Sequence, residues 1–527
     1  MSFKPTSEQE AIRLGAQKGE SMLVRAGAGS AKTTTLKLLA PALQGTMLAV
    51  AFNKRIAEDL AKAMPPHTVV KTLNGLGHGA WSKQRGGRLE VDSGKLTRLT
   101  SLVMKGANVK DEDGEIWSAV RNFTRALRNG GYVPQGAPPA VVPRQDVEEL
   151  LEQFSLDTGF DEGLMSGDTL IGLAEEVLRR SIMEGFQKII DYDDQIYLST
   201  TYFCPYPKFD VVLVDESQDL SSVNHTQLLK CRPRQLIAVG DPRQAIYAFR
   251  GADSASMDNL KLKAERDLSL FMKEYPLNTS FRCPKVVVER QQLHYPGFVA
   301  FETNPEGEVR TLHKWGMEDI PEGAAIICRN NAPLVSMGFA LIRARRGFQY
   351  FGVDMAKNLK GLIKKVAGFT GKSLTKNMEQ TPTDKLLVSL EFWYEAEALK
   401  LANSGREEYV SGLKDKKECC RIILQQGKNL GEAMKACDEM FSGTGSITLS
   451  SGHRCKGFEW HDVFHLDYWR IPSKYAREAL SAGSPGQMQQ ENNLRYVIET
   501  RTKMNLTMIS LRDNQDATGV EEDERDA

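Results

Sequence analysis

The chain has 527 residues, of which 41% are hydrophobic, and its 68 Lys and Arg residues balance 68 Asp and Glu residues to a formal net charge of zero. This length predicts roughly three or four domains, with enough apolar residues to form a core in each. A zero net charge excludes binding to nucleic acid through the overall field, so such binding would need a locally basic or aromatic groove. No apolar run approaches the ~20 residues of a membrane-spanning helix, and the polar residues 1–20 do not resemble an export signal. We therefore expect a soluble, cytoplasmic protein.

The eight cysteines stand at positions 204, 231, 283, 328, 419, 420, 437 and 455. They form no C-x-x-C pair, and no paired histidines lie at ligand spacing. This pattern favours reduced thiols that fill cores, as in cytosolic proteins, and argues against an iron–sulfur or zinc site.

Residues 5–12 predict a capped helix start, and residues 22–35, MLVRAGAGSAKTTT, predict a strand, a phosphate loop and the first turn of a helix. In such a loop backbone N–H groups surround a phosphate, Lys32 adds a positive charge, and the Thr33 hydroxyl is a ligand for Mg²⁺. The pattern G-x-x-x-x-G-K-[ST] requires glycine where this chain has Ala26 and Ala31, so an ordinary glycine-rich turn is the alternative. We expect Ala31 to have a negative φ, because its methyl group disfavours a positive one.

The next elements alternate between strand and helix. Residues 47–52 predict a second buried strand followed by a helix start at 53–55, which is typical of a parallel sheet covered by helices on both faces. Residues 69–72 predict a third strand, which ends at 73–75. From about 90 to 185 charged helical segments are broken by Gly and Pro clusters, which indicates a helical insertion. A second helical stretch is expected at 340–366.

Residues 209–214, FDVVLV, predict a buried strand that ends in Asp215-Glu216-Ser217-Gln218-Asp219. Chemistry in α/β enzymes lies at the carboxyl ends of such strands, where Asp215 can hold Mg²⁺ and Glu216 can orient or deprotonate the attacking water. A solvated acidic loop is the alternative. Another strand, 235–239, leads into residues 240–252, whose amide, guanidinium and aromatic groups could sense a γ-phosphate or stack on bases.

These motifs, in this order across residues 5–503, resemble those of superfamily 1A DNA helicases of the UvrD/Rep/PcrA type, in a reduced form. Residue 9 is similar to the adenine-reading glutamine of that family, and residues 26–33 to its motif I. The resemblance implies nucleotide contacts from Gln9, Ala26, Gly27, Ala28, Gly29, Ser30, Ala31, Lys32, Thr33 and Thr34. Residues 51–54 resemble motif Ia in the shorter form of F-box-type relatives, and residues 72–75 resemble motif Ib, with Asn74 where the family often has histidine. The implied DNA contacts are Phe52, Asn53, Lys54, Thr72 and Asn74.

The remaining motifs follow in order. Residues 191–194 are similar to the acidic signature that precedes motif II, residues 215–219 to motif II, and residues 240–252 to motif III. In motif III, Gln244 would link nucleotide state to DNA. The side chains that would face the DNA strand are Tyr247, Phe249 and Arg250.

Motifs of the second half complete the resemblance. Residues 278–282 resemble motif IV, which implies that Phe281 stacks on adenine and Arg282 reaches the γ-phosphate; a surface Phe-Arg pair is the alternative. Residues 453–459 resemble motif V, with His453 and Lys456 near DNA phosphates and Glu459 near the ribose, whereas a lone histidine would more often be a surface or core residue. Residues 494–501 resemble motif VI, which makes Arg501 a second arginine finger across a cleft from the phosphate loop.

The fold implied by this resemblance is α/β, with two RecA-like parallel-sheet P-loop motor cores, each carrying a mainly helical insertion. The first core is expected at 1–90 and 186–280, with its insertion at 91–185. The second core is expected at 281–366 and 445–512, with a reduced helical insertion at 367–444. Residues 513–527 form an acidic tail, expected to be disordered, with a contact to a basic protein partner as the alternative.

The implied function is an ATP-dependent DNA helicase that moves 3′ to 5′ on single-stranded DNA and unwinds duplex DNA, as a monomer or weak oligomer. ATP and Mg²⁺ are the expected cofactors, with Thr33 and Asp215 at the metal. The implied catalytic residues are Lys32, Asp215, Glu216, Gln244, Arg282 and Arg501. Two alternatives stay open: a translocase that removes proteins or remodels recombination intermediates with little unwinding, and a nucleotide-gated DNA-binding protein whose ATPase is weakened by Ala31.

Overall fold

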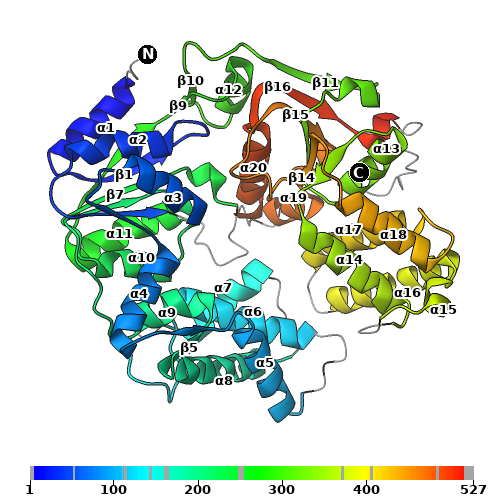
Figure 1. Cartoon of the computed structure of the whole chain (residues 1–527), viewed down its shortest axis with the longest axis horizontal. Coiled ribbons are helices and arrows are strands. Elements are labelled where there is room, and N and C mark those ends of the chain that lie inside the picture. Colours follow the sequence, from blue (N-terminus) through cyan, green and yellow to red (C-terminus); the bar gives the residue numbers. More distant parts are fainter. Residues whose placement is uncertain are drawn as a thin grey trace. The chain divides into compact units, whose positions relative to one another are not determined.

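The computed structural model describes residues 5–51, 54–109, 111, 115–141, 145–158, 165–246, 255–369, 373–403, 407–481, 483 and 486–514. The chain divides into two compact units, Met1–Thr279 and Ser280–Ala527, whose elements are labelled in Figure 1. Each unit contains one six-stranded sheet. Among the described helices, none combines the length and the apolar character needed to cross a membrane.

The sheet of the first unit is parallel at every strand pair. Its strands, in spatial order, are β3 (Thr68–Thr72), β2 (Met47–Ala51), β6 (Val211–Val214), β7 (Gln235–Gly240), β1 (Ser21–Ala26) and β8 (Met272–Leu277). The helices that accompany it are α1 (Ser7–Gln17), α2 (Lys32–Leu39), α3 (Lys54–Ala63), α4 (Leu73–Arg85), α9 (Tyr192–Thr201), α10 (Ser222–Lys230) and α11 (Ser256–Leu268).

Side chains of these strands alternate between two hydrophobic cores, as the two-residue period of a strand requires. Met22 and Val24 of β1 pack with α1, α2 and α3, whereas Leu23 lies on the opposite face with α4, α9, α10 and α11. Because both faces are covered, the central strands β2, β6 and β7 are buried along their whole length and read as largely apolar runs in the sequence. The parallel sheet confirms the predicted α/β fold class for this unit.

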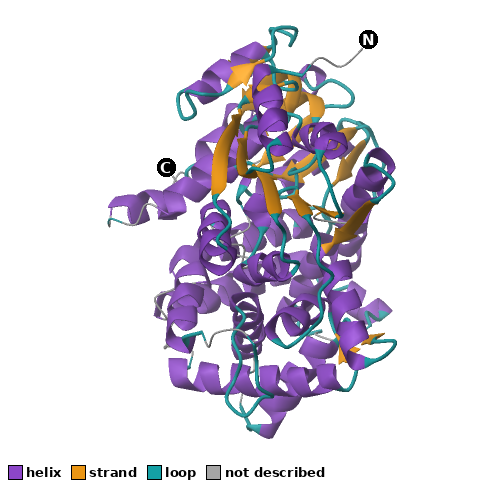
Figure 2. Cartoon of the chain, turned by 90° about the vertical axis from the view of Figure 1, so that its left-hand side faces the viewer, coloured by secondary structure: helices purple, strands orange, loops and turns teal. Residues whose placement is uncertain are grey.

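A group of described helices lies within the segment that separates β3 from β6 in the sequence. They are α5 (Lys95–Gly106), α6 (Glu115–Gly130), α7 (Val147–Thr158) and α8 (Gly167–Phe186), and they lie between the short paired strands β4 (Glu90–Val91) and β5 (Ile189–Ile190). Figure 2 shows this part of the unit as helices with one small strand pair. Its apolar side chains, among them Phe123 and Leu173, join the core on the α4 and α9 face of the sheet.

The second unit also has a wholly parallel sheet. Its strands, in spatial order, are β11 (Glu308–Leu312), β16 (Thr502–Ile509), β15 (Trp460–Leu466), β12 (Ala325–Cys328), β14 (Ile447–Ser451) and β13 (Phe348–Tyr350). The other elements are β9 (Thr279–Ser280), β10 (Val299–Ala300), α12 (Lys285–Gln292), α13 (Ala332–Arg343), α19 (Lys474–Ser481) and α20 (Gly486–Glu499). This second parallel sheet matches the predicted pair of RecA-like cores.

A group of helices stands between β13 and β14 in the sequence. It comprises α14 (Val353–Val366), α15 (Lys376–Glu379), α16 (Thr383–Asn403), α17 (Glu407–Leu424) and α18 (Leu430–Phe441). Leu359, Ile363 and Leu390 of these helices share one core with Ile326 of β12. The helical stretch expected at 340–366 is divided between α13 and α14, because the edge strand β13 pairs in parallel with β14 between them.

Candidate nucleotide and nucleic-acid site

The predicted phosphate loop joins β1 to α2 at the carboxyl end of β1, which lies between β7 and β8. The loop is tied to the sheet because Gly27 N–H donates to the Leu277 carbonyl at 2.9 Å. Ser30 closes a turn by donating its N–H to the Gly27 carbonyl at 3.3 Å. The Ser30 side chain is buried, and its hydroxyl has no hydrogen-bond partner among the described residues. Buried unpaired hydroxyls are uncommon, so this one is available to a ligand of the loop.

Ala31 has φ 59° and ψ 41°, so the prediction of a negative φ is wrong. The chain enters α2 directly after this residue, and the sharp turn into the helix imposes the left-handed conformation. A left-handed backbone costs a non-glycine residue roughly 1–2 kcal/mol. The conformation is held from the next turn, because the Ala31 carbonyl accepts both the Thr35 N–H at 2.8 Å and the Thr35 hydroxyl at 3.1 Å. Glycine would adopt this conformation without the cost.

The predicted catalytic side chains of motifs I and II meet in the first unit. The Thr33 hydroxyl donates to Asp215 Oδ2 at 2.7 Å, and Lys32 Nζ lies 3.3 Å from Glu216 Oε2. Glu216 itself has φ 53°, and its N–H donates to Asp215 Oδ1 at 2.9 Å. Strained non-glycine backbone is most common at functional sites, and here it occurs on both sides of the same contact.

Burial governs the ionisation of this cluster. Burial and the neighbouring Glu216 carboxylate raise the pKa of Asp215 to about 6, although Lys32 and the Thr33 hydroxyl act in the other direction. Burial also raises the pKa of Asp241. Burial acts to lower the pKa of Lys32, but the carboxylates of Glu216, Asp241 and Asp215 outweigh it, so the pKa is raised. Three acids therefore share one ammonium group, and this excess of carboxylates favours a further cation.

A chain of buried hydrogen bonds joins motif II to motif III. Gln218 Nε2 donates to Glu216 Oε2 at 2.7 Å, while Gln218 Oε1 accepts the Asp241 N–H at 2.9 Å. Asp241 Oδ2 in turn accepts from Gln244 Nε2 at 2.7 Å, and Asp241 Oδ1 accepts the Arg243 N–H at 3.1 Å. Gln244 is thus connected to Glu216 through two side chains, so a displacement at either end can be transmitted along this chain.

Gln9 lies beside the first turn of α2. Its Nε2 donates to the Thr35 hydroxyl at 3.1 Å, and its Oε1 accepts the Thr6 N–H at 3.1 Å. The side chain is fully buried. The Nε2 group therefore holds α1 against Thr35, the residue that fixes Ala31, while Oε1 completes the N-terminal cap of α1. The predicted adenine contact stays a prediction.

Two predicted arginine fingers lie close together within the second unit. Arg282 Nη1 is 3.5 Å from Glu459 Oε2, while its buried Nε and Nη2 have no hydrogen-bond partner among the described residues. Arg501 is buried and donates to the Val497 carbonyl at 2.8 Å, and it forms no ion pair with a carboxylate in the described part of the chain. Burial and the charge of Arg282 lower the pKa of Arg501 to about 10. Two neighbouring guanidinium groups, of which only Arg282 pairs with a carboxylate among the described residues, favour a bound anion.

The other predicted nucleotide contacts in this unit are Phe281 and Glu459. The Phe281 ring packs on Phe301, with 4.7 Å between centroids. Glu459 pairs with Lys503 as well as with Arg282, and although burial opposes them, these cations hold the pKa of Glu459 below its usual value. Its predicted ribose contact stays a prediction.

The structure describes about half of the predicted DNA contacts. Phe52, Asn53, Tyr247, Phe249 and Arg250 lie outside the described residues. Lys54 is exposed, the Thr72 hydroxyl caps α4 by accepting the Gly75 N–H at 3.1 Å, and Asn74 Nδ2 donates to the Tyr192 carbonyl at 2.7 Å. His453 and Lys456 stand in the turn that follows β14.

Comparison with known proteins agrees with the family resemblance. Residues 8–250 match a protein family described as an AAA domain. An F-box DNA helicase of Schizosaccharomyces pombe is 24% identical over 545 aligned residues, which cover 95% of this chain. The chain is thus similar to this F-box DNA helicase over nearly its whole length.

Further helicases are similar to parts of this chain, and each alignment covers only part of the other protein. An F-box DNA helicase of Gallus gallus is 25% identical over 262 residues, or 47% of this chain. An ATP-dependent helicase/nuclease protein of Latilactobacillus sakei is 47% identical over 55 residues, or 10% of this chain. The aligned regions span 57% of the S. pombe protein, 24% of the chicken protein and 6% of the L. sakei protein.

Three residues of the site were not identified from the sequence pattern. Asp241 and Gln218 form the link between motifs II and III, and Lys503 pairs with Glu459. Asp241 could have been identified from the sequence, since it follows a buried strand just as Asp215 does. Gln218 also had a signal, since it belongs to residues 215–219, which resemble motif II. Lys503 had none, because only the fold brings its ammonium group to Glu459.

Proposed function

We propose that the protein is a DNA-dependent ATPase that uses ATP and Mg²⁺ to move 3′ to 5′ along single-stranded DNA and to unwind duplex DNA. The observation that carries the proposal is the convergence of Lys32, Thr33, Asp215 and Glu216 at the ends of two parallel strands, linked by hydrogen bonds to Gln244. The similarity to F-box DNA helicases supports the same function. The direction of movement rests on the family resemblance.

Thr33 and Asp215 are the residues that fit Mg²⁺. A hydroxyl and a carboxylate 2.7 Å apart supply the hard oxygen ligands that this ion prefers, and the surplus of acids around Lys32 favours a divalent cation. The bound ion would neutralise charge on the β- and γ-phosphates.

The other groups of the first unit have separate roles in hydrolysis. Lys32 would balance phosphate charge, and Glu216 would orient the attacking water and accept its proton. Gln218 contacts Glu216 and holds the backbone of Asp241, which in turn binds Gln244. A displacement of Glu216 would therefore move Gln244 and, with it, the residues after Gln244 that are predicted to face the DNA strand. In the second unit, the unpartnered donors of Arg282 and the carboxylate-free Arg501 would bind phosphate oxygens.

The test of this assignment is Glu216→Gln. The amide keeps the shape but cannot accept the proton, so we expect ATP turnover in the presence of single-stranded DNA to fall at least about a hundredfold, within the usual range for a general base. ATP binding, measured with a fluorescent analogue, should stay within a few-fold of wild type. Glu274→Gln is the matched control, because Glu274 is a surface acid paired with Arg25 and Lys261. Full turnover in Glu216→Gln would refute the catalytic role.

A further inference from the structure

Helix α6 carries a basic and aromatic ridge that none of the helicase motifs includes. Trp117, Arg121 and Arg125 follow one another at intervals of four residues, so they share one side of the helix. We call these three residues the α6 ridge. The Arg121 guanidinium lies 5.7 Å from the centre of the Trp117 ring, and the Trp117 ring N–H donates to the Ser101 hydroxyl at 3.0 Å.

Arg121, the middle residue of the α6 ridge, has no counter-ion in the described part of the chain. No carboxylate of the described residues lies within ion-pair distance of it, and its buried Nε has no hydrogen-bond partner among them. Burial and the neighbouring charge of Arg125 lower the pKa of Arg121. An anion bound to the ridge would offset both the burial of the Arg121 charge and its repulsion by Arg125.

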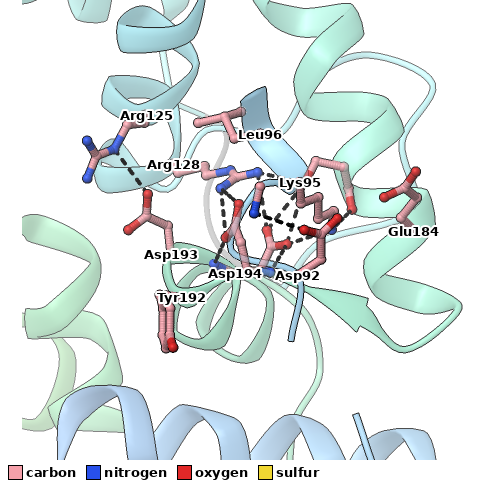
Figure 3. A network of polar contacts seen from close by, with 12 residues as sticks. Asp92, Lys95, Leu96, Arg125, Arg128, Glu184, Tyr192, Asp193 and Asp194 are labelled. Atoms are coloured by element: carbon pink, nitrogen blue, oxygen red, sulfur yellow. Dashed lines mark hydrogen bonds and ion pairs between the residues drawn. The ribbon is translucent and has the colours of Figure 1, made fainter. Parts of the chain in front are cut away.

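Arg125 has only a weak partner. Its Nε lies 3.1 Å from Asp193 Oδ2, and the two side chains are 48% and 38% exposed (Figure 3). Pairs as exposed as this contribute little to stability, so a phosphate group can take the place of the aspartate. Asp193 belongs to the acidic segment 191–194, which follows β5 and opens α9.

The inner side of α6 is fixed by a buried network. Arg128 Nη1 donates to Asp191 Oδ2 at 2.8 Å, and Arg128 Nη2 lies 3.4 Å from Asp194 Oδ1. Lys95 Nζ donates to Asp194 Oδ2 at 2.6 Å and to the Ser181 carbonyl at 2.7 Å. Figure 3 shows Arg128 and Lys95 converging on the acids, while Arg125 meets Asp193 separately.

Buried ion networks add little net stability, because desolvation offsets their attraction, so their better supported role is to fix register. Here the two inward acids, Asp191 and Asp194, lock α6 to the start of α9, and the outward Asp193 faces the ridge. The first residue of α9 extends this arrangement, since the Tyr192 carbonyl accepts from Asn74 at 2.7 Å. The ridge therefore has a fixed position relative to Thr72 and Asn74, the predicted DNA contacts at the start of α4.

We propose that the α6 ridge binds the sugar-phosphate backbone of the nucleic-acid strand that contacts Thr72 and Asn74, with Asp193 as the group that the phosphate displaces from Arg125. This inference rests on the proposed function. It adds a binding surface on the helical insertion to those on the motor core.

The test compares single-stranded DNA affinity, by fluorescence anisotropy of a labelled oligothymidine over a range of salt concentrations, for Arg121→Gln/Arg125→Gln and for a control. The control, Arg179→Gln/Arg180→Gln on α8, removes the same charge from the same insertion, at two arginines that both pair with Glu176. Each lost phosphate contact lowers the salt slope by about 0.7 for a single strand, so the ridge variant should lose about 1.4 and bind about 25-fold more weakly at 0.1 M salt. In the control variant, the loss of salt slope and the loss of affinity should each be less than a third of those in the ridge variant.

A second variant separates binding from folding defects. Asp193→Asn frees Arg125 from its competing carboxylate and should tighten DNA binding roughly two- to fivefold, which a destabilised protein would not do. If wild type binds DNA but the ridge variant matches the control, or Asp193→Asn fails to tighten binding, the ridge proposal is overturned while the proposed function stands. If wild type binds no DNA, both are overturned.

Discussion

Ala31→Gly tests the conformation of the phosphate loop. Ala31 has φ 59°, a conformation that costs alanine roughly 1–2 kcal/mol and glycine nothing. Glycine also loses more entropy on folding, by roughly 0.4–1 kcal/mol. The balance is a net stabilisation of about 0.5–1 kcal/mol, which for a unit of this size corresponds to a rise in Tm of about 1–3 °C.

The assay is thermal unfolding followed by circular dichroism, with Ala28→Gly as the control. Ala28 is a buried alanine of the same loop and is not among the residues with positive φ, so glycine there should lower Tm. Opposite signs for the two variants are the expected result. If Ala31→Gly lowers Tm as Ala28→Gly does, the left-handed conformation of Ala31 is refuted. Much faster ATP turnover in Ala31→Gly would mean that alanine slows the enzyme at this position.

Two further variants test the buried acids. The pKa of Asp215 in the folded state, about 6, lies above the usual 3.8, so the native state binds the extra proton and stability falls as the pH rises from about 4 to 6. Asp215→Asn should therefore have a higher Tm than wild type at pH 7.5 but not at pH 4, in the absence of nucleotide and Mg²⁺, while losing ATPase activity; an equal or lower Tm at pH 7.5 would contradict this account. In Asp241→Asn, one side-chain oxygen remains for two donors, Gln244 Nε2 and the Arg243 N–H, which now bind different oxygens of Asp241. The free energy of unfolding, measured by urea denaturation, should therefore fall by about 1–3 kcal/mol. Unchanged stability would argue against the link to Gln244.

Apolar runs and turn residues in the sequence were sufficient to predict most strands of the first parallel sheet, whereas the second sheet was expected only from the family resemblance. The run at 209–214 and the strand at 47–52 are apolar without alternation, which is what burial on both faces requires. The structure begins the first of these strands at Val211, directly after Asp210, whose carboxylate accepts hydrogen bonds from Thr46. Strand β13 was missed because three residues between two helices carry too little periodic signal.

Part of the candidate site could likewise be predicted from the sequence, and part could not. Lys32, Thr33, Asp215 and Glu216 follow strands whose carboxyl ends share one edge of the sheet, so their proximity could be predicted from topology. The conformation of Ala31 could not, because the angle at which the chain enters α2 is set by the packing of that helix. The buried network around Arg128 was also beyond sequence reasoning, since an arginine on an amphipathic helix is usually a surface residue.

The central claim, that ATP hydrolysis is coupled to a DNA strand, is tested most directly by the steady-state ATPase rate of the wild-type protein with and without single-stranded DNA. The account predicts a stimulation of tenfold or more, equivalent to about 1.4 kcal/mol of the activation barrier. An ATPase rate that DNA leaves unchanged, or the absence of hydrolysis under both conditions, would contradict it.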